Sequence, residues 1–144
     1  MSRYLTTYLI FDGDAREAME FYRSVLGGHL DVMTYGDMGE TGPLPPPEGV
    51  MHALLVAEDG FRIMASDGPP GEEVRRGNDF AVALSGEADD EAVLRGWWDA
   101  ISARGTVDVP LEKQMWGAWF GQVTDAWGVA WMFNIESGEE PHAS

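Results

Sequence analysis

The sequence predicts an α+β protein made of two successive modules that share the element order βαβββ. Three observations point to this fold class. Eight short apolar segments have the length and flanking turn residues of strands, and two others show apolar residues at helical spacing. The same order of segments occurs twice, with starting points roughly 75 residues apart. At 144 residues, the whole chain (1–144) has the size of a single domain.

The first module is expected over residues 4–66 and begins with a strand at Tyr4–Phe11. Alternation places Thr6, Tyr8 and Ile10 on one side of this strand and the residues between them on the other. The three remaining strands of the module are expected at His29–Tyr35, Val50–Glu58 and Phe61–Ser66.

A helix is expected between the first two strands of this module. Asp14 and Glu17 have the spacing of a capping box, and Gly27-Gly28 supplies the end of the helix. Its apolar stripe consists of Ala18, Met19, Tyr22, Val25 and Leu26. Further on, the Pro-rich segment Gly39–Gly49 predicts a loop, since consecutive prolines fit neither a helix nor a central strand.

The second module is expected over residues 79–136, after a polar linker over residues 67–78 and before an acidic tail over residues 137–144. Asp89 or Asp90 is expected to cap its helix. The apolar stripe of that helix is Val93, Trp97, Ala100 and Ile101. Its strands are expected at Phe80–Ser85, Val107–Val109, Trp119–Thr124 and Val129–Ile135, with the side chains of Trp131 and Phe133 in the core.

Charge and composition exclude several classes of function. The net charge of −16 leaves no basic surface of the kind that nucleic acids or anionic membranes require. The absence of cysteine excludes disulfides, thiolate metal sites and a cysteine nucleophile. No segment is apolar enough to span a bilayer, and the first residues lack the plan of a signal peptide. We therefore expect a cytoplasmic protein that binds neither nucleic acid nor membrane.

Four phrases in this chain resemble one family. The phrase EFYRSVLGG (Glu20–Gly28) is similar to the end of the first helix in vicinal-oxygen-chelate proteins, and TDAWGVAWMFN (Thr124–Asn134) is similar to the turn before their last strand. The longer phrases Met51–Gly68 and Met115–Asn134 resemble the PhnB-like branch. The chain thus looks like a member of the glyoxalase/bleomycin-resistance/dioxygenase superfamily, which implies a fold of two βαβββ modules.

The resemblance also implies where a metal would be bound. Family enzymes take one ligand from the first strand and one from the fourth strand of each module, and the matching positions here are Thr6, Met64, Ala81 and Met132. A hydroxyl, two thioethers and a methyl group are not ligands for hard divalent cations. We therefore expect no metal and no other cofactor, with a divalent metal as the alternative.

The remaining candidates suggest an apolar or aromatic cleft. His52 is the histidine best placed for hydrogen bonding or acid–base chemistry, although a histidine satisfied at the sheet surface is the simpler interpretation. Methionine and aromatic side chains suit flat apolar ligands. The residues expected to bind a ligand are Thr6, Tyr8, His52, Met64, Trp116, Trp119, Met132 and Asn134.

Three functions remain open at this point. The first is a metal-free protein that binds a small apolar or aromatic molecule, as antibiotic-resistance members of the family do. The second is an enzyme (a lyase, isomerase or dioxygenase) that uses a metal or His52. The third is a regulatory or interaction module with a vestigial cleft. A homodimer is expected in each case, because many relatives pair across chains and the Gly39–Gly49 loop is long enough to reach a partner.

Overall fold

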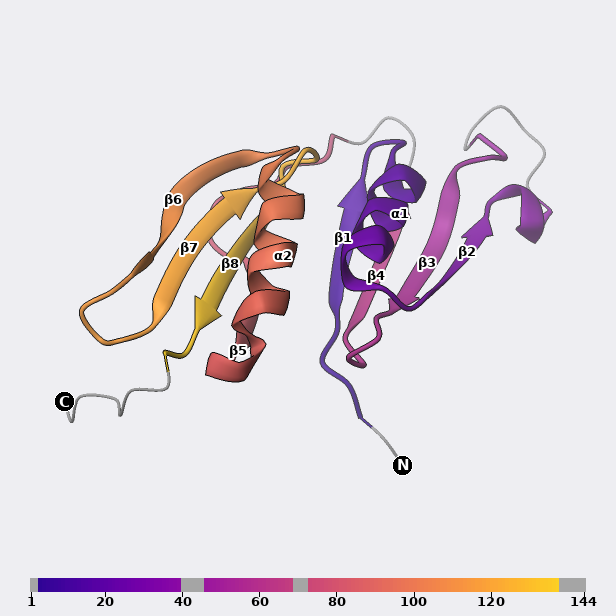
Figure 1. The fold of residues 1–144 in the computed structure, drawn as a ribbon. Coiled ribbons are helices and arrows are strands. Elements are labelled where there is room, and N and C mark those ends of the chain that lie inside the picture. Colours follow the sequence, from indigo (N-terminus) through magenta and orange to yellow (C-terminus); the bar gives the residue numbers. More distant parts are fainter. Residues whose placement is uncertain (1–2, 40–45, 69–72, 138–144) are drawn as a thin grey trace. The chain divides into compact units, whose positions relative to one another are not determined.

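A computed structural model of the chain describes residues 3–39, 46–68 and 73–137. The chain forms two compact units, which divide between Arg75 and Arg76 and are described separately. Each unit contains one four-stranded sheet and one main helix, in the order βαβββ (Figure 1). The predicted α+β fold with two such modules is therefore confirmed.

The first unit is built on sheet 1, with the strand order β1-β4-β3-β2. The β1 strand runs parallel to β4, and the other neighbours are antiparallel. Its elements are β1 (Thr7–Phe11), α1 (Ala15–Leu26), β2 (His29–Thr34), the short 3-10 helix η1 (Gly36–Met38), β3 (Val50–Val56) and β4 (Arg62–Asp67).

The second unit repeats this plan in sheet 2, with the strand order β5-β8-β7-β6 and a parallel pair formed by β5 and β8. Its elements are β5 (Val82–Gly86), the 3-10 helix η2 (Ala88–Asp90), α2 (Glu91–Ser102), β6 (Thr106–Lys113), β7 (Trp119–Thr124) and β8 (Ala130–Ile135). The helices of the described residues are too short and too polar to cross a membrane.

Several predicted boundaries need correction. The β6 strand is much longer than the expected Val107–Val109, because Pro110 is tolerated in an edge strand whose register is irregular. The two first strands begin at Thr7 and Val82, later than expected. Asp67 ends β4 and is buried, so it belongs to the sheet and not to the linker. Of the predicted Gly39–Gly49 loop, residues 40–45 lie outside the described residues.

The core of the first unit lies between α1 and one face of sheet 1. The buried helix residues include Ala18, Met19, Tyr22 and Leu26, as the helical spacing predicted. They face the buried strand residues Leu9, Phe11, Ala53, Leu55, Ile63 and Ala65. Full burial of one large apolar side chain contributes about 1.5–3 kcal/mol, so this layer accounts for the placement of the helix.

The core of the second unit differs from prediction in the helix stripe. Val93 is 52% exposed, and the buried residues of α2 are Leu94, Trp98 and Ile101. These three residues have the i, i+4, i+7 spacing of one helical face. The buried stripe therefore begins at Leu94, one residue after the predicted start at Val93. The Trp98 ring meets the buried Phe133 ring edge to face at 5.3 Å. Trp131 and Phe133 are fully buried, as predicted.

Two buried aspartates at strand ends accept hydrogen bonds from backbone N–H groups, and Asp67 binds segments that are distant in sequence. Asp67 accepts hydrogen bonds from the backbone N–H groups of Ala15 (2.9 Å) and Val50 (2.8 Å). The start of α1 is thus held by Asp67. Asp14 occupies the cap position but forms no side-chain capping bond, so the predicted capping box is wrong.

Asp125 is the corresponding anchor of the second unit. It accepts hydrogen bonds from the backbone N–H groups of Trp127 and Val129 and from the indole Nε1–H of Trp131, each at 2.9 Å. The turn between β7 and β8 and the largest core side chain are therefore fixed by one carboxylate.

Candidate functional site

Alternation along the strands of sheet 1 leaves one face that α1 does not cover. We call it the helix-free face of sheet 1. On the central strands, Ala53, Leu55, Ile63 and Ala65 point toward the helix and are buried, so the residues between them occupy the other face. The helix-free face of sheet 1 includes Tyr8, Ile10, Asp31, Met33, His52, Leu54, Val56, Arg62, Met64 and Ser66.

The strand register shows which of these side chains are neighbours. Met64 pairs with Tyr8 on one side and with Leu54 on the other, and Met33 pairs with His52. Residues that are directly paired on adjacent strands have side chains that are neighbours on the same face of the sheet. Of the predicted ligand-binding residues, Tyr8 and Met64 are thus adjacent.

Tyr8 and His52 are also brought together, although they lie 44 residues apart in sequence. The Tyr8 hydroxyl and His52 Nδ1 share a hydrogen bond of 3.2 Å, and the two rings are 5.7 Å apart between centroids. Tyr8 is 45% exposed, so this pair is accessible. Thr6 lies immediately before β1 and is half-buried. The Tyr8–His52 pair thus lies beside the apolar side chains of Met33, Leu54 and Met64.

Sheet 2 has an equivalent helix-free face, which includes two residues that the sequence did not identify as candidates. Met132 pairs with Ala83 and Gln122, and Asn134 pairs with Ser85 and Phe120. Gln122 and Phe120 are therefore direct neighbours of two predicted site residues. Strict alternation along Trp119–Thr124, combined with the position of the buried Val123, was the signal that would have identified them. On β5, β7 and β8, the helix-free face of sheet 2 includes Ala83, Ser85, Phe120, Gln122, Thr124, Ala130, Met132 and Asn134.

The two predicted tryptophans do not lie on this face. Trp119 pairs with the buried Ile135, and the Arg95 guanidinium of α2 lies 4.5 Å from its ring centre. Trp119 is therefore on the helix side of sheet 2, and its expected role as a ligand-binding residue is not supported by its position. Trp116 lies at the tip of the β6–β7 hairpin, where it is 56% exposed beside Met115, which is 93% exposed.

The positions implied for metal ligands hold unsuitable side chains. Met64 and Met132 lie in central strands, while Thr6 and Ala81 precede β1 and β5. The residues actually paired with the two methionines across the parallel ladders are Tyr8 and Ala83. Neither set offers the carboxylate or imidazole ligands that divalent cations require. Within the described part of the chain, no group of three or more His, Cys, Asp or Glu side chains is placed to hold a metal ion.

This donor set leads to a prediction for metal binding. Addition of zinc, nickel or manganese to the dialysed protein is expected to leave its melting temperature unchanged, because stabilisation requires affinity of the native state for the ion. Differential scanning fluorimetry with and without each ion, together with metal analysis of the purified protein, checks this result. A metal that survives dialysis at one ion per chain and is lost in His52→Ala would contradict it.

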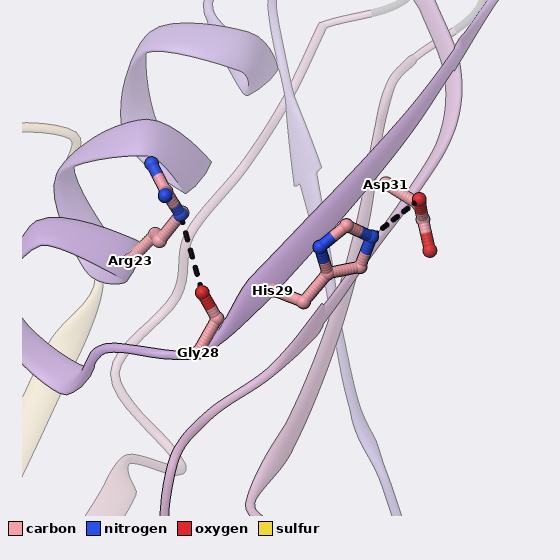
Figure 2. A network of polar contacts seen from close by, with 4 residues as sticks. All are labelled: Arg23, Gly28, His29 and Asp31. Carbon is pink, nitrogen blue, oxygen red and sulfur yellow. Dashed lines mark hydrogen bonds and ion pairs between the residues drawn. The ribbon is translucent and has the colours of Figure 1, made fainter.

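A surface groove lies elsewhere on the first unit, between α1 and the edge strand β2. It has a volume of about 510 Å³ and is lined by Arg16, Glu20, Arg23, His29, Leu30 and Val32. Two hydrogen bonds involve residues of this groove: Arg23 Nε–H donates to the Gly28 carbonyl (3.3 Å), and His29 Nε2 is hydrogen-bonded to Asp31 (2.9 Å) (Figure 2). None of the predicted ligand-binding residues lines this groove.

Comparisons with known proteins agree with the fold and the motifs. The chain is 29% identical to protein YjdN of Escherichia coli (strain K12) over 142 residues, which cover 91% of this chain and 94% of that protein. Its fold is similar to the crystal structure of protein PA1353 from Pseudomonas aeruginosa, with a TM-score of 0.81, 36% identity, and coverage of 94% of this chain and 98% of that one.

A PhnB protein from Bacillus cereus, described as a putative 3-demethylubiquinone-9 3-methyltransferase, shares the fold. Its TM-score is 0.75 at 24% identity, with coverage of 92% of this chain and 99% of that one. The sequence model of the Glyoxalase/Bleomycin resistance protein/Dioxygenase superfamily matches residues 4–133. Together with the two βαβββ units and the four sequence motifs, this match shows that the chain belongs to that superfamily.

Proposed function

We propose that the protein binds a small apolar or aromatic molecule on the helix-free face of sheet 1. The observation that carries this proposal is the Tyr8–His52 pair, whose hydroxyl and imidazole share a hydrogen bond of 3.2 Å beside the apolar side chains of Met33, Leu54 and Met64. Ligand sites typically combine an apolar surface with a few polar groups that orient the ligand. We place the protein in the cytoplasm, where such a ligand would be met in solution.

The apolar side chains of this face support the same proposal. Tyr8, Ile10 and Met33 are each at least 38% exposed, although burial of such side chains would stabilise the folded protein. Burial of apolar surface contributes about 25 cal/mol per Å², so an occupant that covered these side chains would gain affinity from the contact. Met64 and Met33 have flexible side chains that adapt to the shape of an aromatic ring.

The helix-free face of sheet 2, taken by itself, also combines apolar and polar side chains, so we propose ligand contacts there as well. Phe120 and Met132 supply apolar surface, and the amides of Gln122 and Asn134 supply donors and acceptors. Asn134 Nδ2–H also donates to Glu136 (3.3 Å), which orients its amide. These four residues are therefore candidates for ligand contacts, together with Trp116 at the hairpin tip.

Binding is tested with 1-naphthaleneacetate as the probe, followed by quenching of tryptophan fluorescence. We expect saturable binding to the native protein, weakened by about 1–3 kcal/mol in Tyr8→Phe and in His52→Ala, because each substitution removes one polar partner. Trp119→Phe is the control, since Trp119 lies on the helix side of sheet 2. Equal affinity in all four proteins would contradict a site on the helix-free face of sheet 1.

A second candidate function is catalysis without a metal, and the same hydrogen bond favours it. A tyrosine hydroxyl joined to an imidazole can pass a proton to or from a bound substrate, and histidine is the side chain best suited to this near neutral pH. The distinguishing experiment compares native protein with His52→Gln. A compound that both proteins bind and that only the native protein converts would establish an enzyme.

We also propose that the protein is a homodimer, since the exposed apolar tip of the β6–β7 hairpin offers a contact. Met115 and Trp116 are 93% and 56% exposed. We expect sedimentation equilibrium at micromolar concentration to give twice the chain mass of 15.8 kDa, and Trp116→Ser to shift the equilibrium toward monomer. A monomer for the native protein at that concentration would contradict the proposal.

A further inference from the structure

Arg62 has an unusual environment on the helix-free face of sheet 1. It lies at the start of β4, two residues before Met64, and pairs with Val56 of β3. The Tyr4 ring stacks on its guanidinium, with 4.3 Å between Arg62 Cζ and the ring centre. Its Nε is buried, yet it has no hydrogen-bond partner among the described residues.

Other arginines of the chain show what this nitrogen normally does. The Nε–H of Arg95 donates to Glu91 (3.0 Å), that of Arg76 to the Trp127 carbonyl (3.2 Å), and that of Arg23 to the Gly28 carbonyl (3.3 Å). Arg95 is the closest comparison, because it too stacks on an aromatic ring, that of Trp119. Stacking alone therefore does not explain why Arg62 Nε lacks an acceptor among the described residues. A buried donor without an acceptor is costly, and native proteins rarely retain one without a function.

We propose that the ligand of this face carries an anionic oxygen group, a carboxylate or a phosphoryl group, which accepts hydrogen bonds from the Arg62 guanidinium. The inference rests on the proposed function and adds the chemical class of the ligand: a small organic acid with an apolar or aromatic body. A planar guanidinium presents its donors in a fork that matches a carboxylate or phosphate. The anion would lie at Arg62, and the body would extend across Met64 toward Tyr8 and His52.

Two further features fit this orientation. Tyr4 precedes β1 and is 64% exposed, so its ring can move away from the guanidinium without breaking any pairing within the sheet. Asp31 lies at the other end of the row that contains Tyr8, Met64 and Leu54, on the edge strand β2. Its carboxylate disfavours an anionic group at that edge and so directs the acid toward Arg62.

The first test compares an acid with its neutral counterpart. We expect the native protein to bind 1-naphthaleneacetate at least about tenfold more tightly than 1-naphthaleneacetamide, on the scale of one charge-assisted hydrogen bond. This preference should disappear in Arg62→Met and persist in Arg95→Met, the stacked control on the other unit. Comparison with 1-naphthyl phosphate then decides whether a carboxylate or a phosphoryl group fits better. Equal affinity for the acid and the amide in the native protein would overturn the inference.

The second test observes Arg62 without the apolar part of the ligand. Acetate and inorganic phosphate are added to ¹⁵N-labelled protein, and the Nε–H signals of Arg62 and Arg95 are followed by NMR. We expect a saturable shift for Arg62 and none for Arg95; no greater response at Arg62 than at Arg95 would overturn the inference. If the naphthalene acid and amide bind equally and the Arg62 Nε–H signal does not shift, the inference is wrong and the proposed function stands. If Arg62 responds to the small anions but no naphthalene probe binds, the anion site stands and the apolar ligand is wrong.

Discussion

The substitution Asp125→Ala is expected to lower the free energy of unfolding by about 3–5 kcal/mol, since it leaves three donors without their acceptor. These donors are the backbone N–H groups of Trp127 and Val129 and the Trp131 indole N–H. Asp125 is 5% exposed, so water cannot readily replace the lost carboxylate. Urea unfolding of the native and substituted proteins measures the difference.

A double-mutant cycle separates this effect from a general loss of packing. Trp131→Phe removes the indole donor, and its cost should be smaller in the Asp125→Ala background than in the native protein. Asp99→Ala, at an exposed position of α2, serves as the matched control and should change stability by less than about 0.5 kcal/mol. Additive costs for Asp125→Ala and Trp131→Phe would show that the hydrogen bond does not couple them.

The second large effect is expected at Gly28, where α1 passes into β2. Gly28 has φ of +96°, and an added Cβ would lie 2.0 Å from the Val56 carbonyl oxygen. Because this contact is with backbone, no side chain can move aside to relieve it. Gly28→Ala is therefore expected to cost about 3 kcal/mol or more, the combined scale of left-handed strain and overpacking.

Gly60 provides the matched control for that substitution. Its φ is +88°, but an added Cβ meets nothing within 4 Å. Gly60→Ala should therefore cost only the conformational strain, about 1–2 kcal/mol. Thermal or urea unfolding of both variants gives the comparison. If the two substitutions lower the free energy of unfolding by the same amount, the close approach of Gly28 to β3 is not a determinant of the fold.

The fold was predictable because each module carries its own periodic pattern. Alternation along Thr7–Phe11 and Val129–Ile135 correctly separated the buried residues from those of the helix-free faces, whereas Leu5, expected on the buried side, precedes β1 and is exposed. The helical spacing placed α1 correctly. It misplaced the start of the α2 stripe, because Val93 and Leu94 are equally apolar and only packing against sheet 2 selects Leu94.

The polar anchors and the site were less predictable, for a physical reason. The partners of Asp67 are the backbone N–H groups of Ala15 and Val50. Because nearly every residue type has a backbone N–H group, such a partner cannot be recognised from the sequence. The Tyr8–His52 contact likewise depends on which strands are adjacent in sheet 1. Trp119 was expected in the site because it lies close to other candidates in the sequence. In the sheet, however, it pairs with Ile135, which points to the helix side of β8 together with Trp131 and Phe133. Trp119 therefore lies on the helix side as well.

The central claim, a ligand on the helix-free face of sheet 1, is tested most directly by methionine methyl NMR. The chain contains eight methionines, and four of them report on three distinct places. Met33 and Met64 lie on that face, Met19 is buried in the core, and Met115 lies at the β6–β7 hairpin tip. With [methyl-¹³C]methionine protein and 1-naphthaleneacetate, ring-current shifts are expected at Met64 and Met33 and not at Met19 or Met115. Shifts confined to Met115, or saturable binding without a shift at Met64, would contradict the account.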